Sequence, residues 1–452
     1  MRANEGDIEF IADITSADAY GRPILSQAIF DEVIGVVRSA HDFLVLDYFL
    51  FNDQRGAGVQ TTPTRPLSAE LRDALIERRR VDPQLPIVLI IDPINELYGS
   101  APSRDVALLR AAGVQVVTAN LDVLRDSNFL YSSLWRLCFS WWGSGAPGDG
   151  WLPNPLDEGA EEVTARAWGR LLNFKADHRK VILGGDGKGG LIGIVGSANP
   201  HDASSAHSNV ALKVRGAALA PLLESEIAIA RTAGWKGEIA YKAEAAQAPQ
   251  DPKAPSIQAL TEGAIRARLL AELDAAGAGQ SIDIAMFYIA DRGVVESLLA
   301  AAQRGAAVRL ILDPNKDAFG REKSGIPNRP VATELSSASD GAIHVRWYRT
   351  HGEQFHTKLA MIYGRQRMWL TLGSANFTRR NLADYNLEAN VAVDLPDDAP
   401  LATQVRDYFE TLWSNRAPLG IEYTTDYGFY ADPAPSHYWL YRFMESTGLS
   451  TF

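Results

Sequence analysis

The sequence of 452 residues contains a single cysteine, Cys138. One thiol can form neither an intramolecular disulfide nor a multi-thiolate metal cluster, and such a composition is typical of a reducing compartment. The sequence also lacks any run of the roughly 20 apolar residues that a membrane-spanning helix needs. Its first residues show no basic segment followed by an apolar run, so we predict no signal peptide. We therefore expect a cytoplasmic protein, either free or attached peripherally to a membrane.

An excess of positive charge is absent as well. Lys and Arg total 44 whereas Asp and Glu total 55, which gives a formal net charge of −11. A surface that follows a phosphate backbone would need the opposite sign, so we expect no stable nucleic-acid partner, although a local basic pocket remains compatible. Hydrophobic residues make up 46% of the chain, which is enough for large cores, and the length predicts two domains.

Five short blocks occur in the same order in both halves of the chain. In the first half they are Phe43–Phe51, Val88–Pro93, His178–Leu183, Gly196–Asn199 and Asn209–Leu212. In the second half they are Ile282–Ile289, Leu310–Pro314, His356–Met361, Gly373–Asn376 and Asn390–Val393. Such self-similarity over most of the sequence predicts two copies of one fold.

Apolar runs rich in Val, Ile and Leu alternate with helix-like stretches in both halves. Because these runs show no polar alternation, we predict strands buried on both faces and an α/β fold of two sandwich lobes, each a mixed sheet flanked by helices. An insertion at about 121–171 has no counterpart in the other half. The predicted divisions are an N-terminal lobe (1–242), a linker (243–257), a C-terminal lobe (258–420) and an aromatic tail (421–452).

Each half presents one histidine, one lysine, one serine and one asparagine at two-residue spacings. They are His178, Lys180, Ser197 and Asn199 in the first half, and His356, Lys358, Ser374 and Asn376 in the second. Residues two apart on a strand share a face, so each half can present an imidazole beside an ammonium and a hydroxyl beside an amide. Imidazole is a nucleophile and exchanges protons near neutral pH, while the other groups donate to oxyanions. The set suits attack on phosphorus.

Two copies of this set can supply both the nucleophile and the general acid that cleavage of a phosphodiester needs. A histidine that attacks the phosphorus forms a phosphohistidine, and the leaving alkoxide needs a proton from a group on the opposite side, which a second histidine can give. The lysines and asparagines would balance the phosphate charge. We therefore expect neither a metal nor another cofactor.

The duplicated HxK and GSxN motifs resemble those of the phospholipase D superfamily, from about residue 25 to about residue 415. The resemblance implies two lobes related by pseudo-two-fold symmetry, with one active site shared at their interface. It also implies metal-free phosphoryl transfer through a phosphohistidine, with water or an alcohol as the acceptor.

The chain departs from the H-x-K-x4-D pattern of that family in both halves. Gly185 stands at the position of the aspartate in the first half, with Asp186 one residue later, and Tyr363 stands there in the second. In the family this aspartate is mainly structural, so the reacting groups remain. The subgroup that cleaves protein–DNA phosphodiesters also lacks it, which leaves the substrate class open.

An acidic residue downstream of GSxN orients the histidine of the opposite lobe in the family. Glu388 stands at that place in the second half, and the resemblance makes it the partner of His178. In the first half we expect His207 to replace the acid, unless Asp202 does so. The two histidines are then unequal, with His178 as the nucleophile and His356 as the general acid.

Two pairs of residues next to the motifs leave alternatives open. Asp92 and Asp313 end apolar strands, where an aspartate commonly caps the following turn, and a place at the rim of the site is the alternative. Arg379 and Arg380 follow the second GSAN sequence. They could hold a lipid phosphate or cap a sheet edge.

Two aromatic-rich segments also allow two interpretations. The insertion contains Trp135, Trp141 and Trp142 within a stretch too short and too polar to span a membrane. Since Trp and Tyr favour the membrane–water boundary, the stretch is either a contact with a lipid interface or an internal helix packed on the first lobe. The aromatic tail is either a strand that covers the lobes or a wall of an acyl-chain pocket.

These observations favour a phosphodiesterase or phosphatidyl transferase that acts on glycerophospholipids at a membrane surface, similar to bacterial phospholipase D and to cardiolipin synthase-like proteins. Two alternatives remain: a nuclease or nucleic-acid end-processing phosphodiesterase of the same superfamily, and an inactive membrane or protein adaptor. Because both halves of the site lie on one chain, we expect a monomer.

Overall fold

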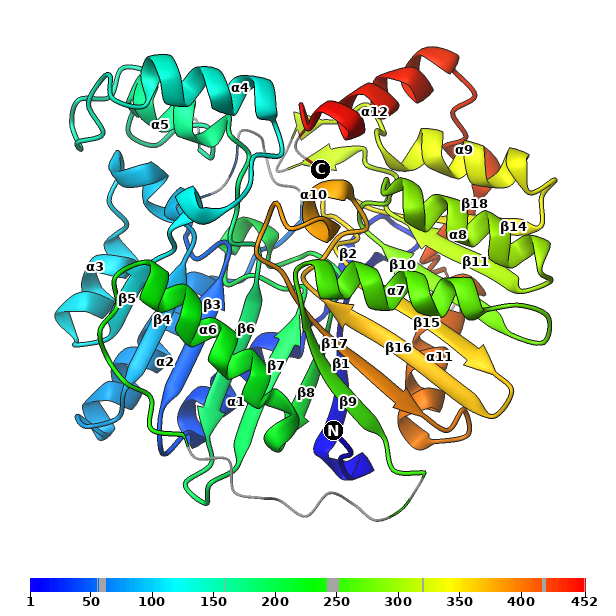
Figure 1. Cartoon of the computed structure of the whole chain (residues 1–452), viewed down its shortest axis with the longest axis horizontal. Helices are drawn as coiled ribbons and strands as arrows, with labels where there is room; N and C mark the ends of the chain where they lie inside the picture. The colour runs from blue at the N-terminus through cyan, green and yellow to red at the C-terminus, as the bar shows by residue number, and fades with distance from the viewer. Residues whose placement is uncertain are drawn as a thin grey trace.

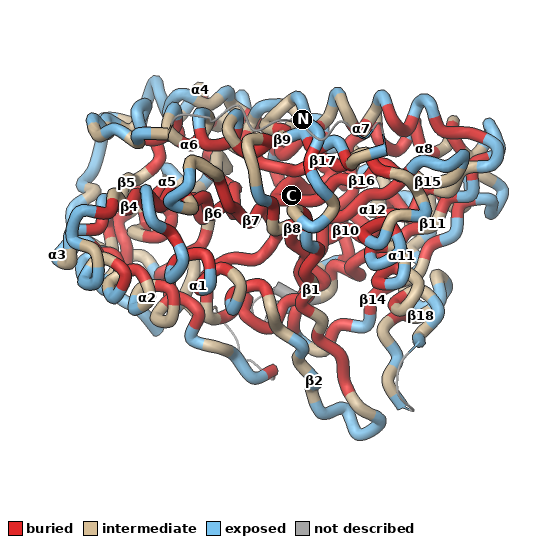
Figure 2. Tube along the Cα trace, turned by 90° about the horizontal axis from the view of Figure 1, so that it is seen from below, coloured by how far each residue is buried: buried red, intermediate tan, exposed pale blue. Residues whose placement is uncertain are grey.

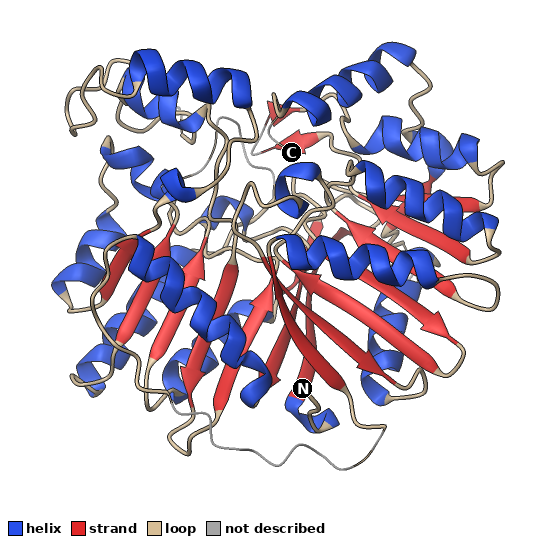
Figure 3. Cartoon of the chain, in the orientation of Figure 1, coloured by secondary structure: helices blue, strands red, loops and turns tan. Residues whose placement is uncertain are grey.

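The computed structural model of the protein describes residues 1–54, 56, 62–157, 159–241, 251, 253–318, 321–416, 420–450 and 452. Two lobes lie side by side, the N-terminal lobe in blue to green and the C-terminal lobe in green to red (Figure 1). Each lobe contains an eight-stranded mixed sheet with helices packed against it (Figure 3). The predicted α/β fold of two sandwich lobes is therefore confirmed.

The N-terminal sheet has the strand order β2-β1-β8-β7-β6-β3-β4-β5. Strands β3, β4 and β5 run parallel and the other neighbours antiparallel. The strands are β1 (Ile8–Ala17), β2 (Pro23–Ser26), β3 (Leu44–Tyr48), β4 (Ile87–Ile91), β5 (Gln115–Thr118), β6 (Lys180–Gly185), β7 (Leu191–Gly196) and β8 (Asn209–Arg215). The α-helices are α1 (Ile29–Ser39), α2 (Leu67–Val81), α3 (Arg104–Ala111), α4 (Phe129–Leu134), α5 (Ala165–Leu171) and α6 (Ala220–Thr232).

The C-terminal sheet has the order β18-β14-β11-β10-β15-β16-β17-β9. Its strands are β9 (Ser256–Thr261), β10 (Ser281–Met286), β11 (Ala307–Leu312), β14 (Ile343–Tyr348), β15 (Lys358–Gly364), β16 (Arg367–Gly373), β17 (Ala389–Leu395) and β18 (Thr424–Asp426). A short hairpin pairs β12 (Asp317–Ala318) with β13 (Arg321–Glu322). The α-helices are α7 (Gly263–Ala275), α8 (Arg292–Gln303), α9 (Asn328–Ala338), α10 (Arg379–Leu382), α11 (Pro400–Trp413) and α12 (Pro435–Thr447).

The two sheets share one connectivity. The series β1-β8-β7-β6-β3-β4-β5 corresponds to β9-β17-β16-β15-β10-β11-β14, with parallel pairs at matching places. Strand β4 reads Ile-Val-Leu-Ile-Ile and every residue is buried, as expected of an interior parallel strand covered on both faces. The internal repeat in the sequence is thus a repeat in the structure.

A continuous apolar core joins the two lobes. Val195 and Leu212 of the N-terminal sheet belong to the same buried cluster as Leu372 and Val391 of the C-terminal sheet. Two further cores lie between each sheet and the helices on its other side. Figure 2 shows most of the strands as the buried interior, with β2 and β18 at the periphery, and the helices with exposed outer faces. Because the central core belongs to both lobes, it fixes their relative position and so the geometry between them.

The segments outside the repeat add to this frame. Most of the predicted linker lies outside the described residues, and its last two residues, Ser256 and Ile257, already belong to β9. In the tail, β18 extends the C-terminal sheet beside β14. Tyr441 of α12 is buried and accepts a hydrogen bond from Arg292 of α8 (2.7 Å). Within the described parts of the chain, no helix has the length and apolar character to cross a bilayer.

Candidate active site

The motif residues of each lobe meet because β6 and β15 each form a hairpin with the next strand. Strand β6 begins at Lys180 and its partner β7 ends at Gly196, just before Ser197. In the C-terminal lobe, β15 begins at Lys358 and β16 ends at Gly373. Since antiparallel neighbours bring the start of one strand beside the end of the other, HxK and GSxN come together at the same end of these two neighbouring strands.

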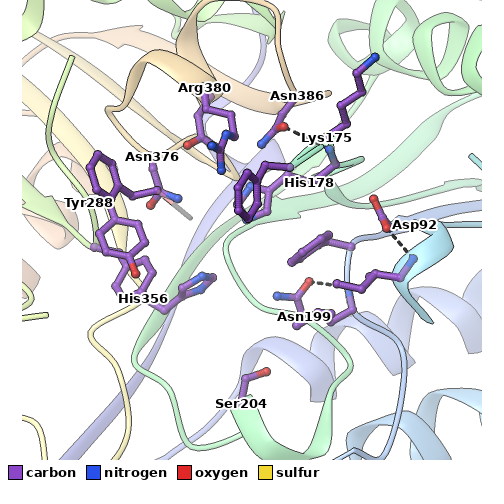
Figure 4. Close-up of a pocket in the computed structure, with 18 of the residues that line it drawn as sticks. Asp92, Lys175, His178, Asn199, Ser204, Tyr288, His356, Asn376, Arg380 and Asn386 are labelled. Atoms are coloured by element: carbon purple, nitrogen blue, oxygen red, sulfur yellow. Dashed lines mark hydrogen bonds between the residues drawn. The ribbon is translucent and has the colours of Figure 1, made fainter. Parts of the chain in front are cut away.

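One cavity collects these groups from both lobes. The eight motif residues are buried, with at most 9% of any residue exposed. A cavity of about 260 Å³ is lined by His178 and Asn199 of the N-terminal lobe and by His356 and Asn376 of the C-terminal lobe. Figure 4 shows the two imidazoles and the two amides around one space. The arrangement has the shape of a single site at the interface of the lobes.

Backbone hydrogen bonds across the interface place each histidine against the other lobe. The amide of His178 donates to the carbonyl of Leu387 (2.9 Å), and the amide of Ser208 donates to the carbonyl of Gln354 (3.1 Å). These contacts belong to two short parallel bridges, one before each histidine. They bring the residue after Leu387 beside His178, and the residue after Ser208 beside His356.

Glu388 is the residue after Leu387, and its carboxylate contacts His178. Nδ1 of His178 lies 3.0 Å from Oε1 and 3.1 Å from Oε2 of Glu388, which is completely buried. The carboxylate also accepts from the hydroxyl of Ser374 and from the amide of Asn381. Burial by itself would raise the pKa of Glu388, but His178, Lys180 and the Ser374 hydrogen bond hold it below its ordinary value.

Asn209, the residue after Ser208, makes the corresponding contact with His356. Its Oδ1 lies 3.0 Å from Nδ1 of His356 and accepts from the hydroxyl of Ser197 (2.9 Å). The expectation that His207 or Asp202 fills this position is wrong. Nδ1 of His207 accepts from the backbone amide of Gln354 (3.2 Å), and its ring lies beside that of His356 with centroids 5.9 Å apart.

Asp202 is engaged elsewhere, because its carboxylate accepts from the backbone amide and the hydroxyl of Ser68 (3.1 and 3.0 Å). The spacing from the motif serine explains why the sequence misled. Glu388 follows Ser374 by 14 residues, whereas Asn209 follows Ser197 by only 12. The hydroxyl of Ser197 accepts from the backbone amide of Val210, and the hydroxyl of Ser374 accepts from that of Ala389, so Val210 and Ala389 are structurally equivalent. The loop after the serine is two residues shorter in the first lobe, and equivalent residues therefore differ by two in their distance from the serine.

Burial favours the neutral form of both imidazoles. It lowers the pKa of His178 to about 4, with Lys180 and Lys358 adding to the shift and Glu388 opposing it. Burial and Lys358 lower the pKa of His356 well below 6.5. A neutral His178 that donates Nδ1–H to Glu388 presents the lone pair of Nε2 to the cavity. This is the tautomer that a nucleophile needs.

The two lysines are buried beside the histidines. Nζ of Lys358 donates to the carbonyl of His356 (2.9 Å), and Nζ of Lys180 donates to that of His178. Desolvation lowers the pKa of Lys180 to about 7, although Glu388 opposes the shift. An anionic phosphate beside these ammonium groups would supply the missing negative charge.

Two phenylalanines that the sequence analysis did not single out cover the motifs symmetrically. The ring centroids of Phe49 and His178 lie 5.0 Å apart, and those of Phe287 and His356 also lie 5.0 Å apart. Nζ of Lys180 lies 5.2 Å from the Phe49 ring, and Nζ of Lys358 lies 5.2 Å from the Phe287 ring. Both phenylalanines occur in repeated apolar blocks, where they could not be distinguished from core residues.

A buried asparagine fixes the backbone at each of these phenylalanines. Nδ2 of Asn95 donates to the carbonyls of Phe49 (2.8 Å) and Asp92 (3.0 Å). Nδ2 of Asn328 donates to the carbonyls of Phe287 (2.7 Å) and Asp313 (2.8 Å). The two contacts are equivalent in the two lobes even though the intervening loops differ in length.

Asp92 and Asp313 hold the strands that carry the histidines. Their carboxylates accept from the backbone amides of Asp177 and Phe355, the residues before the two histidines (2.7 Å each). Each also accepts from an amide two residues further along its own chain, as an aspartate that caps a turn does. Burial raises the pKa of Asp92 to about 7 and that of Asp313 to about 6. Asp92 also lines the cavity.

Other contacts occupy the positions of the missing family aspartates. The hydroxyl of Tyr363 donates to Asp283 (2.9 Å), which is also paired with Arg309 (2.8 Å). At Gly185 a side chain would collide with Asp42. Neither change removes a group that lines the cavity.

The two arginines after the second GSAN sequence differ in role. Arg380 lines the cavity, is buried, and donates to the carbonyls of Gly448 (3.0 Å) and Ser450. The backbone amide of Arg379 donates to Glu445 (2.8 Å). Both therefore attach α12 to the lobe. Among the described residues, no three His, Cys, Asp or Glu side chains are grouped as metal ligands would be.

Residues 269–413 match the family model described as "Cardiolipin synthase, PLD-like domain". Phosphatidylserine synthase from Haemophilus influenzae Rd KW20 has a similar fold, with a TM-score of 0.59 and 11% identity over 99% of this chain and 95% of that chain. Polyphosphate kinase from Porphyromonas gingivalis gives a TM-score of 0.48 and 11% identity, over 97% of this chain and 53% of that chain. Nuc, a phospholipase D family member from Salmonella typhimurium, gives a TM-score of 0.28 and 21% identity, over 35% of this chain and 95% of that chain.

No curated protein sequence matches the chain. The matched segment contains the second HxK and GSxN motifs, and the N-terminal lobe repeats both the motifs and the connectivity of the sheet. The segment 269–413 of the C-terminal lobe is thus a PLD-like domain by its family match.

Proposed function

We propose that the protein is a metal-independent phosphodiesterase or phosphatidyl transferase that acts on glycerophospholipids through a phosphohistidine. One observation carries the proposal: two buried imidazoles from different lobes line one cavity, and their Nδ1 atoms have unequal partners, a carboxylate and an amide. Because a carboxylate stabilises the cationic imidazole that follows attack, we assign the nucleophile to His178.

In the first step Nε2 of His178 attacks the phosphorus of the phosphodiester. The N–P bond forms while the bond from phosphorus to the leaving oxygen breaks, and His356 gives its proton to that oxygen. Before this step His356 must be protonated. A bound phosphodiester favours that form because its negative charge raises the pKa of a nearby imidazole.

In the second step neutral His356 takes a proton from water or from an alcohol. The oxygen of this acceptor forms a bond to phosphorus, the N–P bond breaks, and His178 is released. Water gives hydrolysis and an alcohol gives transfer. Lys180, Lys358 and the amides of Asn199 and Asn376 donate to the non-bridging oxygens as charge develops on them. With both sets of groups on one chain, we propose a monomer as the active form.

The lining of the cavity supports a lipid as the substrate. Apolar side chains stand beside the reacting groups, among them Phe49, Phe287, Ile94, Leu171 and Phe174. The description of the matched family names cardiolipin synthase, and a protein of similar fold is a phosphatidylserine synthase. The basic residues that line the cavity are Lys175, Lys323 and Arg380. A cavity with both apolar and basic lining suits a molecule with a hydrocarbon part and a phosphodiester.

The test uses purified protein in EDTA with vesicles of phosphatidylcholine, phosphatidylethanolamine and phosphatidylglycerol, with glycerol added as an acceptor. The products are read by mass spectrometry beside the variants His178→Ala and His356→Ala. We expect phosphatidic acid, a new phosphatidyl alcohol or cardiolipin, and we expect both variants to lose it. Full dependence on a divalent cation would contradict the two-histidine chemistry.

Two other results would replace the proposal. Unchanged lipids together with cleavage of single-stranded DNA that depends on His178 would identify a nucleic-acid phosphodiesterase. Conversion of neither substrate, with a cellular phenotype that survives His178→Ala, would identify an adaptor.

A further inference from the structure

Large apolar side chains are exposed on two segments at the same end of the molecule. The first runs from α4 through the stretch that follows it, where Leu137, Trp141 and Trp142 are 79%, 72% and 55% exposed. The second is α12, where Trp439 and Phe443 are 68% and 54% exposed. Figure 1 shows α4 and α12 at one end of the two lobes, with the last residue of the chain between them. Neither segment has a counterpart in the other lobe.

Helix α12 is amphipathic with an apolar outer face. Tyr441 and Glu445 point into the protein and are buried, whereas Trp439, Leu440 and Phe443 lie on the exposed side. A surface helix of a water-soluble domain ordinarily shows the opposite arrangement. Helix α2 does so in this protein, since most of its exposed side chains are charged. The outer face of α12 is therefore unusual for its own fold.

The two segments meet beside the cavity. Helix α12 ends at Gly448, which has a φ of 73° and lies so close to the carbonyl of Ser127, just before α4, that a Cβ would collide with it. The carbonyl of Gly448 accepts from Arg380, a lining residue of the cavity. The cavity is also lined by Phe174, which follows α5 just after the end of the same insertion. The exposed apolar surface is thus connected to the reaction site.

We propose that α4, the stretch after it and α12 form one membrane-docking surface whose aromatic side chains enter the boundary between head groups and acyl chains of a phospholipid bilayer. This inference rests on the proposed function, because it explains how a lipid in a bilayer reaches a buried cavity. Trp is enriched at that boundary, where its ring is apolar and its N–H remains near water. An isolated apolar patch of this kind on a monomer marks an interaction site.

The scarcity of unpaired basic residues on the two segments favours insertion of apolar side chains into the bilayer over electrostatic attraction to anionic lipids. The only basic residue in the stretch from Phe129 to Trp142 is Arg136, which is paired with Asp126 (2.5 Å). In α12 the one Lys or Arg is Arg442, which is half-buried and donates to the hydroxyl of Tyr438 (2.8 Å). The chain as a whole carries −11. Binding through this surface therefore depends on buried apolar area and not on anionic lipids, so salt weakens it little.

The test measures co-flotation of the full chain with phosphatidylcholine vesicles and quenching of Trp fluorescence by brominated acyl chains. The variants are Leu137→Ser/Trp141→Ser/Trp142→Ser and Trp439→Ser/Phe443→Ser. The control is Tyr20→Ser/Val81→Ser, which changes two exposed residues outside the proposed surface. We expect wild type and control to float, also in about 0.5 M NaCl. Each aromatic variant should bind at least about tenfold more weakly at an unchanged unfolding temperature.

The His178→Ala variant separates this inference from the proposed function. If it floats like wild type while no lipid is converted by any form, the docking surface stands and the proposed function fails. A wild-type protein that converts monomeric short-chain lipid but does not float overturns the docking surface. Flotation that the aromatic substitutions leave unchanged also overturns it, as does a wild-type dimer that these substitutions dissociate in the absence of vesicle binding.

Discussion

Nδ1 of His178 lies 3.0 Å from a carboxylate oxygen of Glu388, which comes from the other lobe and is completely buried. The matching atom of His356 lies 3.0 Å from an amide oxygen, that of Asn209. A carboxylate stabilises a positively charged imidazole more than an amide does. The pseudo-symmetric site therefore contains two histidines with different acid–base properties.

Replacing Glu388 by Gln should lower kcat by about 10²–10⁴-fold, because the change keeps the shape of the side chain but removes the charge that orients and stabilises His178. The matched variant Asn209→Asp should remain active. It should also move the alkaline limb of the pH–rate profile to higher pH, because a carboxylate raises the pKa of His356. Equal losses of kcat in Glu388→Gln and Asn209→Ala would contradict the asymmetry.

The pH dependence of kcat/KM should be shifted towards acid. Attack needs neutral His178, whose pKa burial lowers to about 4, and protonated His356, whose pKa burial also lowers. In the free enzyme kcat/KM therefore rises as His178 loses its proton and falls as His356 loses its own. The measured kcat/KM should therefore reach its maximum below pH 6.5, the ordinary pKa of an imidazole. A profile that still rises above that value would be incompatible with this assignment.

Replacing Lys180 by Met should abolish activity and stabilise the protein. The folded-state pKa of Lys180 is about 7 against an ordinary 10.5, so the native state binds fewer protons than the unfolded state between these values. Stability therefore falls as the pH drops from about 10.5 to about 7, and this loss is complete below that range. We expect Lys180→Met to raise the free energy of unfolding at neutral pH by about 1–4 kcal/mol.

The measurement is thermal unfolding at neutral and at alkaline pH, with the surface variant Lys188→Met as control. The gain in stability of Lys180→Met over wild type should shrink as the pH approaches 10.5, the ordinary pKa of a lysine. A destabilised variant at neutral pH would show that the ammonium group is well solvated or fully paired.

Asn95 and Asn328 should act as positioning residues. Each contributes to fixing the backbone at a phenylalanine that covers one histidine–lysine pair. In Asn328→Ala the carbonyl of Phe287 keeps the hydrogen bond from Asn315 (3.1 Å) but loses the shorter one, so Phe287 should loosen and kcat should fall by about tenfold while KM changes less. The lost hydrogen bonds should also cost about 1–3 kcal/mol of stability. The control Asn173→Ala removes a buried amide that contacts only the backbone near α5. Equal kcat in both variants would leave Asn328 with a purely structural role.

Repetition made the fold predictable from the sequence. The blocks around His178 and His356 mark equivalent strands, and runs such as Ile87–Ile91 have the continuous apolar composition that is typical of a sheet covered on both faces. The contact of Glu388 with His178 is the one that the resemblance implied.

The partner of His356 could not be found in the same way. The loop after Ser197 is two residues shorter than its counterpart, and an alignment by the Asn-Val-Ala sequences pairs Asn209 with Asn390, whereas the hydrogen bonds pair Asn209 with Glu388. Phe49 and Phe287 were hidden for another reason. Both lie at the ends of apolar runs. In the sequence, such a residue has the same character as the core residues before it, and only the three-dimensional structure shows that it faces the site.

The central claim is tested most directly by trapping the covalent intermediate. A phosphatidyl ester of p-nitrophenol needs no acid to expel its leaving group, so the His356→Ala variant should release one equivalent of nitrophenol in a burst and then stall, because no base activates the acceptor. Mass spectrometry of peptides from the quenched protein should find the phosphatidyl group on His178. An adduct on another residue, or a wild-type enzyme that turns over without a burst in His356→Ala, would contradict the account.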